Sequence, residues 1–140
     1  MSDEVFRRFL GNDERFDLSK PFVDGKHLYF TDGRAVARRP VGETTVELSE
    51  RYPRNIAAVC NALDDPKLNW RAFCEQRQAV LRLRHEFTPV TVLFADIHLD
   101  LKLVMRLRGI DGLLWSPADD GKSVLFSWLG GQAIIMALVY

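Results

Sequence analysis

The sequence predicts an α+β fold in which short helices pack on antiparallel sheet. The main observation is the order of elements in the C-terminal part of the chain. A strand over 90–96 is followed by an amphipathic helix over 99–107 and by three strands separated by turns at 119–121 and 130–131. This order is a β-α-β-β-β unit, and a looser version of it can be followed in the first half. Because 140 residues fit one domain, we expect a single domain over 1–140 whose two units bury their apolar faces against each other.

The first half combines a helix with a tight hairpin. Apolar residues over 5–10 keep helical spacing and predict the helix. A strand over 27–31 is followed by Asp32-Gly33 and by a return strand over 34–38. A two-residue turn needs positive φ at both central residues, which Asp and Gly tolerate, so we expect Asp32-Gly33 to be that turn. A third strand is predicted over 44–48.

Two helices are predicted between the hairpin and the C-terminal unit. Pro53 can start the first of them, and Pro66 ends it. Its inward-facing positions are Ile56, Val59, Cys60 and Leu63. The second, over 70–85, is expected to be the longest helix of the chain, because its apolar residues keep an approximate helical period.

The C-terminal unit carries the clearest local signals. Asp100 can cap its helix, and Gly109 stands where a C-terminal glycine belongs. Strands over 123–128 and 132–139 are expected to pair across the glycine turn. Residues 134–139 are almost entirely apolar, so we expect this strand to be covered on both faces, either within the chain or by a partner.

The bulk composition limits the classes of function. Lys+Arg and Asp+Glu are 19 each, and the resulting net charge of +0 argues against tight nucleic-acid binding by the whole surface but permits a local basic face. Cys60 and Cys74 make neither a disulfide framework nor a zinc site, and we interpret both as small buried hydrophobes. No signal segment or bilayer-spanning run occurs, so we expect a soluble, cytoplasmic protein without a membrane partner.

Two short segments resemble a known family. Residues 30–37, Phe-Thr-Asp-Gly-Arg-Ala-Val-Ala, are similar to a hairpin of bacterial DNA-polymerase sliding clamps, and residues 134–138, Ile-Ile-Met-Ala-Leu, to the ending of those clamps. The elements from 96 to 131 follow the order of the last half of a clamp domain. Ala137 stands where the family has proline, and this chain has room for one of the three clamp domains. The chain also resembles short phage or prophage proteins of clamp-like pattern. The resemblance implies a DNA-clamp-like domain.

The same resemblance implies contacts to DNA phosphates. In the family, helices line a central hole and present Lys and Arg to the duplex. The corresponding cations here are Arg77, Arg82, Arg84, Lys102, Arg106 and Arg108. Phosphate contact needs long cationic side chains but no sequence-specific geometry. The alternative interpretation is a solvated helix face, since Glu75, Glu86 and Asp100 interrupt the cluster.

A partner groove is the second implication of the resemblance. In the family, the hairpin and the terminal segment line a groove for short peptides of replication proteins. The corresponding positions here are Thr31, Gly33, Val36, Met136 and Leu138. The two family motifs come from neighbouring domains, so in a single-domain chain we expect them to meet only across an interface between copies. The alternative is an ordinary turn and an ordinary core strand.

Enzymatic chemistry has weaker support in the sequence. Asp96, His98 and Asp100 alternate, so on a strand they would share a face and could bind a divalent ion. A helix beginning near Leu99 would break that alternation. On one helix, Cys74 and His85 would lie about 16 Å apart, too far for a catalytic dyad. No phosphate-binding loop, dinucleotide fingerprint or nucleophile elbow occurs, and we expect no cofactor.

Three functions remain open at this point. The first is a non-enzymatic, clamp-like binding or scaffold protein, of phage or prophage type and linked to DNA replication or repair. Its partners would be further copies of itself, duplex DNA and peptides of replication proteins. The second is a stand-alone protein-interaction module that does not bind DNA. The third is a metal-dependent hydrolase built around Asp96 and His98.

Overall fold

The computed structural model describes residues 3–42, 46–73, 79–81 and 91–138. Most of the regular structure is antiparallel strand, and the helices are short, either α-helical (α) or 3-10 (η). In chain order the elements are α1 Glu4–Arg7, β1 Phe22–Asp24, β2 His27–Thr31, β3 Ala35–Pro40, α2 Ile56–Val59, η1 Cys60–Asp64, β4 Arg71–Ala72, β5 Ala79–Leu81, β6 Thr91–Phe94, β7 Ile97–Asp100, α3 Leu101–Val104, η3 Met105–Leu107, β8 Leu114–Pro117, β9 Ser123–Trp128 and β10 Gly131–Met136.

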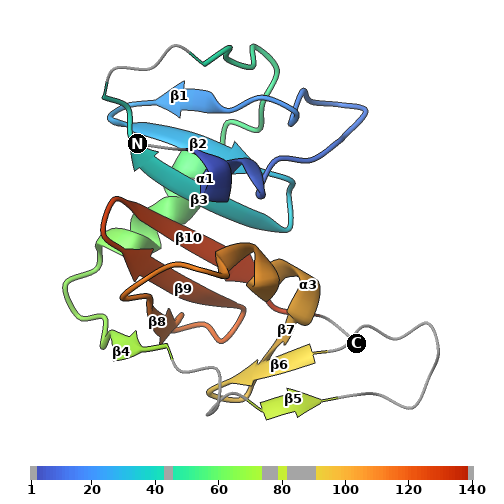
Figure 1. Ribbon diagram of the computed structural model, residues 1–140. Coiled ribbons are helices and arrows are strands. Elements are labelled where there is room, and N and C mark those ends of the chain that lie inside the picture. Colours follow the sequence, from blue (N-terminus) through green and yellow to red (C-terminus); the bar gives the residue numbers. More distant parts are fainter. Residues whose placement is uncertain (1–2, 43–45, 74–78, 82–90, 139–140) are drawn as a thin grey trace.

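The strands form a large and a small antiparallel sheet (Figure 1). The large sheet has seven strands in the order β1-β2-β3-β10-β9-β8-β4, and the small sheet has three in the order β5-β6-β7. The two halves of the chain join where β3 pairs with β10, with Val36 opposite Ile134 and Ala35 opposite Ile135. On each side of this junction lies a three-stranded meander that follows a short helix in the chain. The α+β class is therefore confirmed, and the duplicated order is visible as α1-β1-β2-β3 and α3-β8-β9-β10.

The units differ in detail from the predicted β-α-β-β-β order. In the described part of the first half, no strand precedes α1. In the second half, the single strand predicted over 90–96 is a hairpin, because Ala95 and Asp96 adopt positive φ values of 46° and 70° between β6 and β7. Asp100 pairs with Thr91 across this hairpin, so the helix begins at Leu101 rather than at residue 99.

Apolar side chains cover both faces of the large sheet. On one face, Phe6 and Phe9 of the α1 region and Leu103 of α3 belong to the larger core cluster, together with Ile135. On the other face, Cys60 and Leu63 of η1 pack with Ile134 in a second cluster. Burial of each such side chain contributes about 1.5–3 kcal/mol. The prediction that the last strand is covered on both faces is confirmed for Ile134 and Ile135, which are at most 2% exposed.

The long helix predicted over 70–85 is wrong wherever the structure describes that segment. Arg71–Ala72 is strand β4 and pairs with β8, and Ala79–Leu81 is strand β5 and pairs with β6. The period of a short apolar run does not distinguish a strand from a helix. In this segment, pairing with strands that are distant in the sequence determines the strand conformation. Residues 74–78 and 82–85 lie outside the described residues. Of the strand predicted over 44–48, the described residues 46–48 belong to no strand.

The helix predicted from Pro53 is confirmed in a shorter form. It consists of α2 and η1, and Cys60 and Leu63 face the core as expected, at 0% and 4% exposure. Val59 was expected to face inward and is 42% exposed. The winding changes from α-helical to 3-10 at Cys60, and with three residues per turn Cys60 and Leu63 stay on one side of the helix.

Candidate nucleic-acid interface

Helices α1 and α3 lie on the same side of the large sheet (Figure 1). Arg8, which directly follows α1, connects it to the end of η3. The Arg8 guanidinium donates from Nη1 to the backbone oxygens of Arg106 and Arg108, at 3.0 and 2.9 Å. These oxygens belong to the end of η3, where carbonyl groups have no partner within the helix. A cationic donor is favoured at such an end, so Arg8 satisfies these acceptors and links α1 to η3.

The outward sides of these helices carry cations. We call the following five residues the helix face: Arg7, Arg8, Lys102, Arg106 and Arg108. Phe6 and Phe9 point into the core, whereas Arg7 is exposed and the Arg8 side chain, which is 20% exposed, reaches from α1 to η3. In α3 and η3, where Leu103, Val104 and Leu107 are buried, Lys102 and Arg108 are exposed and the Arg106 side chain is 21% exposed.

The five cations of the helix face differ in how accessible their charge is to a ligand in solution. Arg7, Lys102 and Arg108 are exposed. Arg8 forms a long ion pair of 3.4 Å with the exposed carboxylate of Glu4, and such surface pairs contribute little. Arg106 has a short ion pair, since its Nη2 lies 2.7 Å from Asp32 Oδ2. The exposed cations of the helix face are thus the ones best suited to contact phosphate.

Asp32 belongs to the β2–β3 hairpin, whose turn is shifted by one residue from the prediction. Gly33 has φ +89° and is the first central residue, and Arg34 is the second. Asp32 precedes them, and its Oδ1 accepts the backbone N–H groups of Arg34 and Ala35 at 2.8 and 3.0 Å. The tight reversal at Gly33 is confirmed, but Asp32 acts through its side chain rather than by adopting positive φ.

A second ion pair joins the same hairpin to α3. Arg34 Nη2 lies 2.9 Å from Asp100 Oδ2. Asp100 Oδ1 accepts the backbone N–H of Lys102 at 2.9 Å, which confirms Asp100 as the helix cap. The Asp100 side chain is only 8% exposed, so both of its oxygens are committed inside the protein.

The five predicted partner residues differ in their exposure to solvent. Thr31 and Val36 are buried, at 2% and 5% exposure. Thr31 Oγ1 donates to the Ala35 oxygen at 2.7 Å and accepts the Gly33 N–H at 3.0 Å, so this side chain serves the turn. Met136 is 43% exposed at the end of β10, and Leu138 is half-buried beyond it.

The two motifs meet within one chain. Strand β3 pairs directly with β10, and the backbone N–H of Met136 donates to the Arg34 oxygen at 3.1 Å. The expectation that they could meet only across an interface between copies is therefore wrong. Both meanders end at the centre of the same sheet, and this topology brings the hairpin beside the C-terminal strand. Beyond β10, the backbone N–H of Leu138 donates to the backbone oxygen of His98 in β7, at 2.8 Å.

The carboxylates and the histidine considered for a hydrolase do not form a ligand set. His98 and Asp100 share β7, as the alternation requires, and Asp96 is in the turn before it. Within the described ranges, no group of three or more His, Cys, Asp or Glu side chains is arranged to hold a metal ion. The other proposed cations, Arg77, Arg82 and Arg84, and the pair Cys74 and His85, lie outside the described residues.

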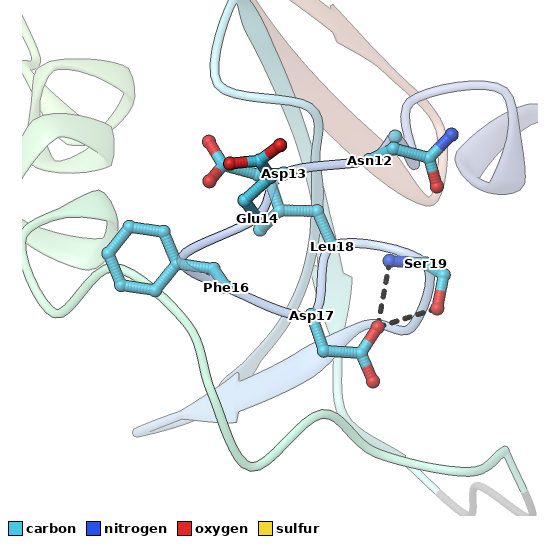
Figure 2. Close-up of a pocket in the computed structure, with 8 residues that line it drawn as sticks. Asn12, Asp13, Glu14, Phe16, Asp17, Leu18 and Ser19 are labelled. Atoms are coloured by element: carbon cyan, nitrogen blue, oxygen red, sulfur yellow. Dashed lines mark hydrogen bonds between the residues drawn. The ribbon is translucent and has the colours of Figure 1, made fainter.

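A shallow hollow of about 330 Å³ lies in the loop that follows α1 (Figure 2). The loop is closed by a hydrogen bond of 3.0 Å from the Gly11 N–H to the Leu18 oxygen. The backbone N–H of Arg15 lowers the pKa of Asp13, and the Ser19 hydroxyl lowers the pKa of Asp17. These ionised carboxylates repel phosphate, so the hollow is a poor extension of the helix face.

No protein family, curated protein or solved structure matches this chain. The helix face is therefore interpreted from its own charge and geometry. Among the residues that the structure describes, no helix has both the length and the apolar character needed to cross a membrane.

Proposed function

We propose that this chain is a non-enzymatic, clamp-like binding protein that contacts the phosphates of duplex DNA through the helix face. The observation that carries the proposal is the bond from Arg8 to the end of η3, which holds the cations of two helices on one side of the sheet. Long cationic side chains on a fixed surface are sufficient for sequence-independent phosphate contact. Arg7, Lys102 and Arg108 supply the contacts, and Arg8 positions them.

The resemblance to sliding clamps supports the biological side of this proposal. A DNA-clamp-like domain of phage or prophage type would act as a scaffold in replication or repair, in the cytoplasm. Self-association would let several copies surround a duplex. Light scattering tests this part, and we expect a homo-oligomer rather than a monomer.

Fluorescence anisotropy with a labelled duplex tests the proposed contacts. The triple variant Arg7→Ala, Lys102→Ala, Arg108→Ala should bind more weakly. Its slope of log K against log salt should be less steep by about 2.7, since each lost phosphate contact removes about 0.9. The matched control replaces three exposed cations outside the helix face, Lys26, Arg54 and Lys67, with alanine. Equal losses in the two triple variants, or no binding by the parent, would contradict the proposal.

A protein-interaction module without DNA binding is the second candidate. The observation in its favour is that the hairpin and the last strand lie side by side and leave Met136 43% exposed at their junction. A flexible, polarizable side chain of this kind suits peptide docking. Titration with peptides of replication proteins tests it. Met136→Ala should weaken binding, whereas Met105→Ala, which removes an equally exposed methionine from η3, should not.

A further inference from the structure

The two carboxylate oxygens of Asp32 have different partners. Oδ1 accepts the backbone N–H groups of Arg34 and Ala35 and so holds the hairpin turn. Oδ2 lies 2.7 Å from Nη2 of Arg106, a member of the helix face. At this distance the two opposite charges form a close ion pair. One side chain thus links the hairpin to the cationic surface.

Arg106 is partly withdrawn from solvent at this contact. Its side chain is 21% exposed, and that of Asp32 is 10% exposed, so salt screens this pair less than a surface pair. The guanidinium carbon lies 5.7 Å from the centre of the Phe9 ring. Among the described residues, Arg106 Nη1 is buried without a hydrogen-bond partner. The guanidinium therefore retains donor capacity that Asp32 does not use.

The backbone around Asp32 keeps its carboxylate at this position. A Cβ atom added to Gly11 would lie 2.4 Å from Asp32 Cβ, so the loop after α1 packs closely against the hairpin. The ion pair between Arg34 and Asp100 fixes the other side of the hairpin to α3. Asp32 cannot move away from Arg106 without disturbing both contacts.

We propose that Asp32 is an internal counter-ion of the helix face, which occupies the Arg106 guanidinium in place of a ligand phosphate and limits the affinity of the face for polyanions. This inference rests on the proposed function, because it concerns the same surface. A carboxylate and a phosphate oxygen present the same chemistry to a guanidinium. Phosphate contacts to this surface therefore come from Arg7, Lys102 and Arg108, while Asp32 keeps Arg106 neutralised.

The substitution Asp32→Asn separates the two tasks of this side chain. The amide oxygen can still accept the turn N–H groups, whereas the amide nitrogen cannot accept from Arg106. The variant should bind a labelled duplex more tightly, with a salt slope steeper by about 0.9, because one further cation becomes available. Between 50 and 200 mM salt its advantage should fall by roughly threefold to fourfold, which follows from the same slope.

Two further variants control for charge and for folding. Asp65→Asn makes the same charge change in a residue that also accepts a local backbone N–H, at the end of η1 and away from the helix face. It should leave the salt slope unchanged. The double variant Asp32→Asn, Arg106→Gln has the net charge of the parent and should return to the parental affinity and slope.

The results distinguish this inference from the proposed function. If the parent binds and Asp32→Asn behaves like Asp65→Asn, only the role of Asp32 is overturned. If the double variant binds more weakly than the parent, with a shallower slope, Arg106 contacts phosphate directly and the inference is again wrong. Binding by Asp32→Asn without binding by the parent would contradict the proposed function of the parent while supporting the role of Asp32, whereas absence of binding in all four proteins would overturn both proposals. Should Asp32→Asn fail to fold, Arg106→Gln in the otherwise unchanged protein decides, because a salt slope shallower than that of the parent by about 0.9 would show that Arg106 contacts phosphate directly and would overturn the inference.

Discussion

Arg34 Nη2 lies 2.9 Å from Asp100 Oδ2, so the tip of the β2–β3 hairpin is tied to the first turn of α3. A second ion pair joins Asp32 to Arg106. Here the acid lies on the hairpin and the base on η3, whereas in the first pair the base lies on the hairpin. Each aspartate uses Oδ1 for backbone N–H groups and Oδ2 for the arginine. The two pairs together fix the hairpin against the helical segment that carries three of the five residues of the helix face.

Replacement of Asp100 should separate its cap from its ion pair. Asp100→Asn keeps an acceptor for the Lys102 N–H and loses only the charge interaction with Arg34. Asp100→Ala loses both, and an N-cap alone contributes about 0.5–2 kcal/mol. We expect Asp100→Ala to lower the free energy of unfolding by about 1–3 kcal/mol and Asp100→Asn by less, measured by urea denaturation. Equal losses would show that the cap contributes nothing.

Gly33 should be intolerant of a side chain for reasons of backbone conformation alone. Its φ is +89°, and no atom lies within 4 Å of an added Cβ, so space is not the constraint. Gly33→Ala should cost about 1–2 kcal/mol, the usual penalty for an L-residue in the left-handed region. Gly33→Asn should cost less, because asparagine enters that region more readily. Urea midpoints of the two variants test this, and a neutral Gly33→Ala would contradict it.

Local signals in the sequence predicted local features of the fold. The reversal at Gly33, the cap at Asp100 and the pairing of the last two strands each depend on residues close together in the chain, and all three are present. Arg7 and Arg8 were missed as candidate site residues, although the apolar spacing of the first helix already implied that they face outward. The apolar spacing of the first helix could therefore have identified these two cations as candidates.

Other features of the fold depend on contacts between residues far apart in the chain, and local sequence patterns do not predict these contacts. Strand β4 exists because Arg71 and Ala72 pair with Trp115 and Leu114, more than forty positions away. No periodicity over two residues can reveal this. The ion pair between Arg106 and Asp32 likewise joins residues that are far apart in the chain. Only the three-dimensional arrangement of hairpin and helix shows this ion pair.

Cys60 should make the stability of the fold depend on alkaline pH. Burial raises the pKa of its thiol to about 12 from the ordinary value of 9.0. Below pH 9 the thiol is neutral in the folded and unfolded states and contributes no pH dependence. Above pH 9 the unfolded chain loses the proton while the folded chain keeps it, so stability falls as pH rises towards 12. The loss from this group approaches about 1.4 kcal/mol per pH unit within that window.

Urea denaturation at several pH values between 8 and 11 measures this effect. Cys60→Ala should be less stable at pH 8, because it leaves a small cavity, but its stability should decline less steeply above pH 9. In a Cys74→Ala background, the Cys60 thiol should also react slowly with a thiol reagent until the chain is unfolded. Rapid modification of the folded protein would contradict the burial of Cys60.

Arg38 and Asp64 should be coupled because one partner is buried and the other is not. The Arg38 side chain is 2% exposed, and its Nη2 lies 2.6 Å from Oδ1 of Asp64, which is 60% exposed. Arg38 Nε also donates to Gln132 at 2.9 Å. Asp64→Ala leaves a buried guanidinium without this carboxylate. We expect a loss of about 1–3 kcal/mol, below the value for a fully buried pair because water reaches Asp64.

A double-mutant cycle measured by urea denaturation isolates this coupling. An apolar side chain at position 38 needs no counter-charge, so Asp64→Ala should have almost no effect in an Arg38→Met background. The same loss in both backgrounds would show that Asp64 stabilises η1 in some other way. Since Asp64 ends η1 and Arg38 lies in β3, a positive coupling energy would identify this ion pair as the polar attachment of the η1 segment to the sheet, on the face opposite the helix face.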